Sequence, residues 1–192
     1  RGGGRGQLRG QLSSAGSTRV SWLAWIRANP RRGLAVVHGH AAHGGRCAEL
    51  CAAMSDHAIA TYAIDVRGHG SSGRARGHAM SWDELIADLV TFCQKVEEDA
   101  HTEVVPLGHS VGGSILLSAI VRGRLRPRRF VVSSPALRVK AVVPGWQVPL
   151  GRVASRLRPA RALAPALAGK HSATAPARAA AHTTPPTAQR TR

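Results

Sequence analysis

Short apolar runs recur along the chain between residues 20 and 135, and each is bounded by Gly, Pro, Asn or charged residues. Runs of this length with such boundaries predict buried strands. The predicted strands are residues 20–26, 34–37, 59–65, 104–107 and 130–133.

Between these runs, apolar residues recur three and four positions apart, which predicts helices over residues 46–57, 81–99 and 113–121. Ser81 is the expected N-cap of the second helix, and two acids follow it in the first turn. Strands and helices therefore alternate. This order predicts an α/β fold with a parallel sheet that helices cover on both faces.

The two ends of the chain break this pattern. Residues 1–19 are rich in Gly, Arg, Gln and Ser without an apolar period, and we expect them to be disordered or to form a loose edge. Residues 138–169 contain scattered apolar positions that could hold a helix over 142–157. Residues 170–192 consist mostly of Ala, Arg, Pro, Thr and His, which predicts a disordered basic tail. Residues 20–137 remain as the α/β core.

Charge is unevenly distributed. The chain carries 27 Lys and Arg against 10 Asp and Glu, a net charge of +17, and every acid lies between Glu49 and Glu103. Basic ends suit nucleic acid or an anionic membrane, but these ends are not interleaved with the aromatic residues that stack on bases. We therefore expect no specific nucleic-acid partner and a peripheral contact with an anionic membrane. A non-enzymatic basic module that binds nucleic acid or anionic lipid is the alternative function.

The three cysteines, Cys47, Cys51 and Cys93, do not have the spacing of a disulfide framework or a metal site. Free thiols are typical of a reducing compartment. The sequence has no apolar run long enough to span a membrane and no visible secretory signal. We therefore expect a cytoplasmic protein. The chain begins with Arg instead of Met, which suggests a fragment or a translation that starts inside a gene.

The strongest chemical signal follows the strand at residues 104–107. Residues 108–112 read Gly-His-Ser-Val-Gly, which matches the G-x-S-x-G nucleophile elbow between a strand and a helix. The small residues Gly108 and Gly112 allow the strand and the helix to pass closely. Ser110 would then present its hydroxyl at a helix N-terminus, where backbone N–H groups favour developing negative charge.

Two other glycine-rich loops follow predicted strands. Residues 38–45 hold three histidines, but they lie on a loop without a nearby carboxylate, which favours an oxyanion loop over a metal site. Residues 68–73 match G-x-G-x-x-G, but the chain continues as a loop through His78 and does not open a helix. We therefore reject a dinucleotide site.

Together, these motifs resemble those of the α/β-hydrolase superfamily, and of its monoacylglycerol lipase and lysophospholipase branch in particular. Members of that branch read H-G-x-x-x-H-x-x-R-Y, D-x-R-G-H-G-x-S and G-H-S-M-G-G, which are similar to residues 38–40, 65–71 and 108–113 here. Residues 131–137 are similar to the branch's strand after the nucleophile, and residues 138–169 to the start of its cap.

The resemblance implies that Ser110 is the nucleophile of a carboxylic ester hydrolase that passes through an acyl-enzyme. It implies an oxyanion hole formed by the backbone N–H groups of His40 and Val111, an acyl ester or lipid substrate, no cofactor and no metal. Asp65 and Arg67 would be scaffold residues. The supporting site residues would be His38, Gly39, Gly108, His109 and Gly112.

One departure from the family is serious. The fold supplies its triad in the order Ser, Asp or Glu, then His, yet no acid follows Ser110 and the only later histidines are His171 and His182. A serine without a base is a weak nucleophile at neutral pH, so we expect an inactive chain and leave open whether it is an enzyme. Two hypotheses explain the chain: a hydrolase truncated or frame-shifted after about residue 169, or a divergent protein that keeps the first half of the fold as a binding module.

Overall fold

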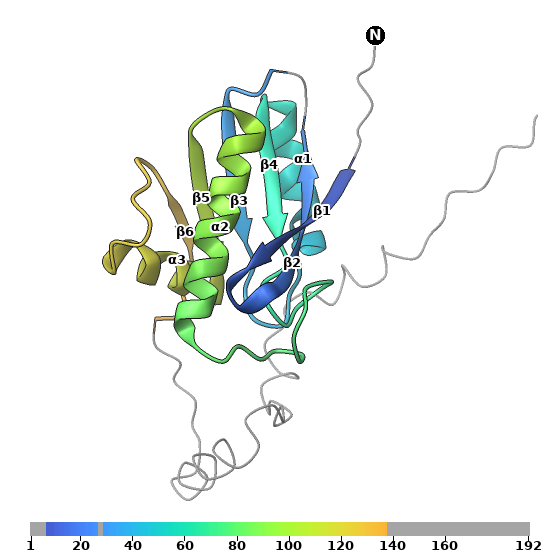
Figure 1. The fold of residues 1–192 in the computed structure, drawn as a ribbon. Coiled ribbons are helices and arrows are strands. Elements are labelled where there is room, and N and C mark those ends of the chain that lie inside the picture. The colour runs from blue at the N-terminus through green and yellow to red at the C-terminus, as the bar shows by residue number, and fades with distance from the viewer. Residues whose placement is uncertain (1–6, 27–28, 138–192) are drawn as a thin grey trace, which may run out of the picture. The chain divides into compact units, whose positions relative to one another are not determined.

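The computed structural model describes residues 7–26 and 29–137. These residues form one six-stranded sheet with the order β1-β2-β4-β3-β5-β6 (Figure 1). The strands are β1 Gln7–Ser14, β2 Thr18–Trp25, β3 Arg32–Val37, β4 Ile59–Ile64, β5 Val104–His109 and β6 Val131–Ser133.

Strands β4, β3, β5 and β6 are parallel, as the alternation of strands and helices predicted. The hairpin of β1 and β2 adds two antiparallel pairings, one within the hairpin and one between β2 and β4. The link between β2 and β3 is short, so β2 runs antiparallel to β3, and therefore also to β4, which is parallel to β3. Parallel strands need a crossover of a dozen or more residues, whereas antiparallel strands do not.

The expectation of disorder is wrong for residues 7–19, which form β1, a turn and the start of β2, whereas the expectation of an edge holds for β1. The strand pairs with β2 in register from Gln7 opposite Trp25 to Ser14 opposite Thr18. Most of its side chains are exposed, and Leu12 is its only buried one. A polar strand at the edge of a sheet is held by backbone hydrogen bonds, so it lacks the apolar period that sequence analysis detects.

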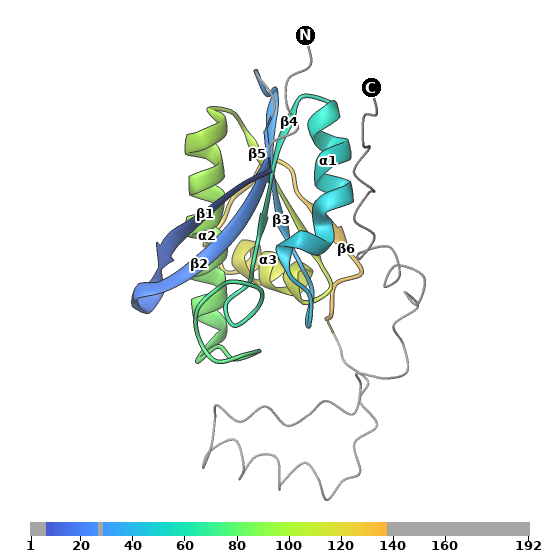
Figure 2. The ribbon, with the colours of Figure 1, turned by 90° about the vertical axis from the view of Figure 1, so that its right-hand side faces the viewer.

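Helices cover both faces of the sheet (Figure 2). On one face, α1 (Ala48–Asp56) packs Cys51 against Leu34 and Val36 of β3. On the other face, α2 (Trp82–Ala100) and α3 (Val111–Val121) pack against Ala35 and Val37 of the same strand. Successive side chains of a strand point to opposite faces, which is why the short apolar run of β3 serves both cores.

The start of α2 agrees with its sequence. The Ser81 side chain accepts a hydrogen bond from the backbone N–H of Glu84 at 3.2 Å, so the predicted N-cap is confirmed. At the other end, His101 takes a left-handed conformation (φ 49°) and closes the helix. The predicted segment 138–169, with its helix at 142–157, and the tail 170–192 lie outside the described residues.

Candidate active site

The carboxyl ends of β3, β4, β5 and β6 lie at the same edge of the sheet because these strands are parallel. The loops that follow them therefore meet there, as ligand-binding loops do in α/β folds. The three motifs found in the sequence occupy the first three of these loops, after β3, β4 and β5.

Ser110 lies between β5 and α3 in a strained conformation, with φ 53° and ψ −117°. Its backbone is held from both sides. Its N–H donates to the carbonyl of Ser133 at 2.9 Å, and its carbonyl accepts from the N–H of Ala136 at 3.1 Å. A positive φ in a non-glycine residue persists only where its surroundings enforce it, and such residues cluster at functional sites.

Glycines surround this serine because no larger residue fits. A Cβ on Gly108 would lie 2.6 Å from the carbonyl oxygen of Gly112, and one on Gly112 would lie 2.3 Å from that of Val37. These contacts explain sterically why the first and last positions of the G-x-S-x-G motif hold glycine. A Cβ on Gly39 would lie 2.9 Å from the Cβ of Ser110. The loop after β3 is therefore packed directly against the serine.

His38, the first residue of the loop after β3, is almost entirely buried and holds this loop in place through two hydrogen bonds. The N–H of Val66 donates to its Nε2 at 2.9 Å, so the proton lies on Nδ1, which donates to the carbonyl of Gly39 at 2.7 Å. Burial lowers the pKa of His38 from 6.5 to about 4. A neutral imidazole thus joins the loop after β3 to the loop after β4.

The two predicted oxyanion-hole residues flank this arrangement. Val111 is the first residue of α3, and the N–H groups of a first helical turn have no acceptor within the helix. His40 follows Gly39 directly, its side chain is exposed, and its N–H makes no hydrogen bond to the described residues. Both N–H groups are therefore available to a ligand.

Two further histidines lie near these loops. The ring of His69, from the loop after β4, lies 5.4 Å from that of His38 and 5.9 Å from that of His40, centre to centre. His109 is exposed, and its Nδ1 lies 3.2 Å from the hydroxyl of Ser133. His109 therefore links the ends of β5 and β6.

Asp65 at the end of β4 uses both carboxylate oxygens to hold loops. Its Oδ1 accepts from the N–H of Gly44 at 2.6 Å, and its Oδ2 accepts from the N–H of Ser71 at 2.7 Å. A Cβ on Gly70 would lie only 2.1 Å from that Oδ2. These contacts are those of a scaffold residue, and they leave Asp65 poorly placed to act as a triad acid.

Arg67 lies completely buried beneath the same loops. Its guanidinium makes a bidentate pair with Asp88 of α2 at 2.9 and 2.7 Å and a second ion pair with Glu84 at 2.9 Å. It also donates to the hydroxyl of Thr18 at 3.3 Å. The loop after β4 is thus joined to α2 and to the β1–β2 hairpin.

The roles of Asp88 and His69 were not predicted from the sequence. Asp88 carries a detectable signal, because it is an acid inside the buried apolar stripe of α2. A buried carboxylate is almost always paired. His69 is part of the motif at residues 65–72, but only the fold brings it beside the loop after β3.

A base for Ser110 is not found among residues 7–26 and 29–137, where no histidine or carboxylate forms a hydrogen bond with this serine. His171 and His182 lie outside the described residues. Within the described part of the chain, no three His, Cys, Asp or Glu side chains form a group that could hold a metal ion. No described helix is both long and apolar enough to cross a bilayer.

An α/β sheet that holds a serine at positive φ between a parallel strand and a helix defines a class, the α/β-hydrolases. Residues 28–191 match the model of the family described as serine aminopeptidase, S33. The chain belongs to this family.

Curated relatives include lipid hydrolases. The chain is 30% identical over 150 residues to the monoacylglycerol lipase of Mycolicibacterium smegmatis, a match that covers 77% of this chain and 54% of that protein. It is 30% identical over 118 residues to the phospholipase YtpA of Bacillus subtilis, covering 59% of this chain and 44% of the relative. The chain thus spans about half the length of these relatives.

Solved structures agree on the fold. The monoacylglycerol lipase of Paleococcus ferrophilus matches with a TM-score of 0.56 and 25% identity, over 80% of this chain and 52% of that one. A carboxyl esterase from Bacillus coagulans matches with a TM-score of 0.59 and 18% identity, over 66% and 43% of the two chains. The second likeness, at this identity, shows the fold alone. The α/β-hydrolase fold expected from the motifs is therefore confirmed.

Proposed function

We propose that this chain carries the nucleophile half of a carboxylic ester hydrolase of the monoacylglycerol lipase or lysophospholipase type, with Ser110 as nucleophile. The observation that carries the proposal is the conformation of Ser110, held at φ 53° with Gly39 packed against it. Its likeness to a monoacylglycerol lipase and a phospholipase supports an acyl ester of a lipid as the substrate class.

In this mechanism, the hydroxyl of Ser110 attacks the acyl carbonyl carbon and its proton passes to a base. The carbonyl oxygen becomes an oxyanion, which the N–H groups of His40 and Val111 would stabilise. Loss of one such donor typically costs about 3 kcal/mol of transition-state stabilisation. The alcohol leaves, and water then releases the fatty acid from the acyl-enzyme.

The proposal includes a weakness in this chemistry. No acid follows Ser110 in the sequence, and the later histidines are limited to His171 and His182. We therefore propose that this polypeptide hydrolyses esters very slowly or not at all. The alternative proposal, a non-enzymatic basic binding module, is supported by the net charge of +17.

A cytoplasmic location is part of the proposal. It is supported by the three cysteines, none of which forms a disulfide.

Burial raises the pKa of Cys51 and Cys93 to about 12, so both stay protonated at neutral pH. Protonated, buried thiols are inert side chains and do not compete with Ser110 as nucleophiles.

The proposal predicts a nucleophile that lacks its base, and this is tested by supplying one. A fluorophosphonate probe should label the chain slowly, and added imidazole should accelerate the labelling because it supplies the missing base from solution. Ser110→Ala should abolish the labelling. Ser118→Ala, on the same helix but away from the elbow, should retain it. Labelling that persists in Ser110→Ala would show that this serine is not the nucleophile. Labelling whose rate does not change with imidazole would contradict the proposal that the chain lacks a base.

A further inference from the structure

Residues 122–129, which we name the basic loop, connect α3 to β6 and read Arg-Gly-Arg-Leu-Arg-Pro-Arg-Arg. All five arginines are exposed, whereas Leu125 and Pro127 between them are partly buried. The arginines at 124, 126 and 128 therefore alternate with residues that face inward. Such a density of one charge on a surface loop is a candidate binding surface for an anion.

The backbone of the basic loop is fixed at its start. Gly123 has φ 67°, and its N–H donates to the carbonyl of Ile120 at 2.9 Å. The N–H groups of Arg124 and Leu125 both donate to the carbonyl of Ala119, at 2.9 and 3.2 Å. The Leu125 side chain packs against the main hydrophobic core. The arginines are therefore presented from a structured turn.

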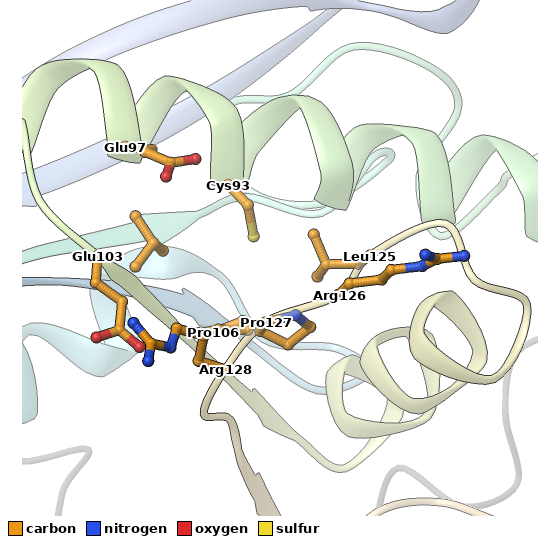
Figure 3. Close-up of a pocket in the computed structure, with 9 residues that line it drawn as sticks. Cys93, Glu97, Glu103, Pro106, Leu125, Arg126, Pro127 and Arg128 are labelled. Atoms are coloured by element: carbon orange, nitrogen blue, oxygen red, sulfur yellow. The ribbon is translucent and has the colours of Figure 1, made fainter.

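The inner side of the loop lines a cavity of about 390 Å³, which Figure 3 shows. Glu97 of α2 and Glu103, just before β5, line it as well. Arg128 points toward Glu103, whereas Arg126 points away from both acids. Arg126 and Arg128 also line this cavity, but its two carboxylates offset their charge, so the cavity itself is a poor place for an anion. The anion-binding surface is therefore the outer side of the loop.

Little in the described structure neutralises this outer side. Arg122 pairs with Asp83 at 2.5 Å, and both side chains are at least half exposed, so the pair is weak. None of the other four arginines pairs with a carboxylate of the described residues. Arg124, Arg126 and Arg129 therefore carry positive charge that no carboxylate of the described residues pairs with.

Exposed apolar side chains flank the basic loop and indicate which anionic partner fits. Val121 before it is 84% exposed, and Phe130 after it is 46% exposed. Basic residues beside exposed apolar residues are typical of surfaces that bind the interface of an anionic membrane. A nucleic acid would favour aromatic residues between the arginines, and residues 122–129 contain none.

We propose that the basic loop docks on an anionic phospholipid bilayer. The loop lies at the amino end of β6, whereas Ser110 follows the carboxyl end of the parallel strand β5. Docking would therefore hold the sheet by the end opposite Ser110. The inference does not depend on the proposed esterase activity, because no residue of that site takes part.

The test measures co-sedimentation of the full chain with phosphatidylcholine vesicles that contain or lack phosphatidylglycerol. Binding should require phosphatidylglycerol and should weaken as salt rises, since salt screens the attraction. The triple variant Arg124→Gln, Arg126→Gln, Arg129→Gln should lower the partition coefficient about fivefold per arginine, on the order of a hundredfold in total. Lysine at the same three positions should keep most of the binding.

A matched control removes the same charge elsewhere. Arg9, Arg19 and Arg46 are exposed and lie in β1, β2 and the turn before α1. Their triple replacement by Gln should lower binding much less than the loop variant. Phe130→Ser should weaken vesicle binding at every salt concentration, because its ring contributes apolar contact.

Three results would overturn the proposal. Equal losses in the two triple variants would mean that only net charge matters. Vesicle binding without phosphatidylglycerol dependence would remove the anionic partner. A single-stranded oligonucleotide that displaces the vesicles, and whose binding the loop variant abolishes, would assign the loop to nucleic acid instead.

Discussion

His38 shows how one buried side chain can set both the shape of a site and its response to pH. Its Nε2 accepts from the N–H of Val66, and its Nδ1–H donates to the carbonyl of Gly39. A second proton on the ring would make Nε2 a donor facing another donor. The neutral form is therefore built into the loop that packs against Ser110.

We predict that this histidine makes the fold less stable in acid. Its pKa is about 4 in the folded chain against 6.5 unfolded, so below pH 6.5 the unfolded chain binds a proton that the folded chain does not. Stability should fall as pH decreases from 6.5 toward 4, with a loss of about 2 to 3 kcal/mol by the lower end of that range. Urea unfolding at a series of pH values measures this loss.

The control for this prediction replaces histidines at two positions. His38→Asn should remove most of the acid-dependent loss, whereas His101→Asn should not, because His101 is exposed and asparagine suits its left-handed conformation. The same pH dependence in both variants would contradict the assignment to His38.

Helix α2 and the loop after β4 are joined by one buried ion pair, which decides how the site is supported. Arg67 is fully buried, and Asp88 is 4% exposed. Asp88 also accepts a hydrogen bond from the hydroxyl of Ser14 at the end of β1. This pair therefore connects elements that are far apart in the sequence.

We predict that Asp88→Ala destabilises the fold by about 3 to 5 kcal/mol, because it leaves the buried guanidinium without its bidentate partner. Glu84 stays near Arg67 and would keep the loss at the lower end of that range. Asp83→Ala is the matched control on the same helix. It breaks the exposed pair with Arg122 and should cost less than about 1 kcal/mol. Thermal and urea unfolding compare the two, and equal losses would contradict the buried pair's structural role.

The described sheet ends in two very different outer strands. β1 is polar, with Gln7, Arg9 and Gln11 along it, whereas β6 exposes Val131 and follows the exposed Phe130. Of the described strands, only β5 pairs with β6. An apolar edge strand with unpaired backbone groups is a template for association with another chain.

We predict that the isolated chain self-associates through β6. Val131→Lys should reduce the association because a charge on an edge strand opposes pairing. Leu8→Lys, on the polar outer strand β1 and at a side chain that is 51% exposed, should leave it unchanged. Sedimentation velocity over a range of protein concentrations measures both. A monomeric wild-type chain with a cooperative melt would contradict the prediction.

The sequence alone predicted five of the six strands, the three helices, the N-cap at Ser81 and the elbow at residues 108–112. These features depend on residues close in sequence: the period of apolar side chains, a capping hydroxyl and the small residues of a sharp turn. Strand β1 was not predicted because its polar residues have no such period, and its position depends on pairing with β2.

Only the tertiary structure decided the strand order, the pairing of Arg67 with Asp88, the tautomer of His38 and the contact of Gly39 with Ser110. Each of these joins residues from different elements, and many alternative partners fit the same local pattern. The choice among them depends on which groups become buried together. In the protein interior, an unpaired charge or hydrogen-bonding group raises the free energy of the folded state, so the stable fold is one in which these groups are paired.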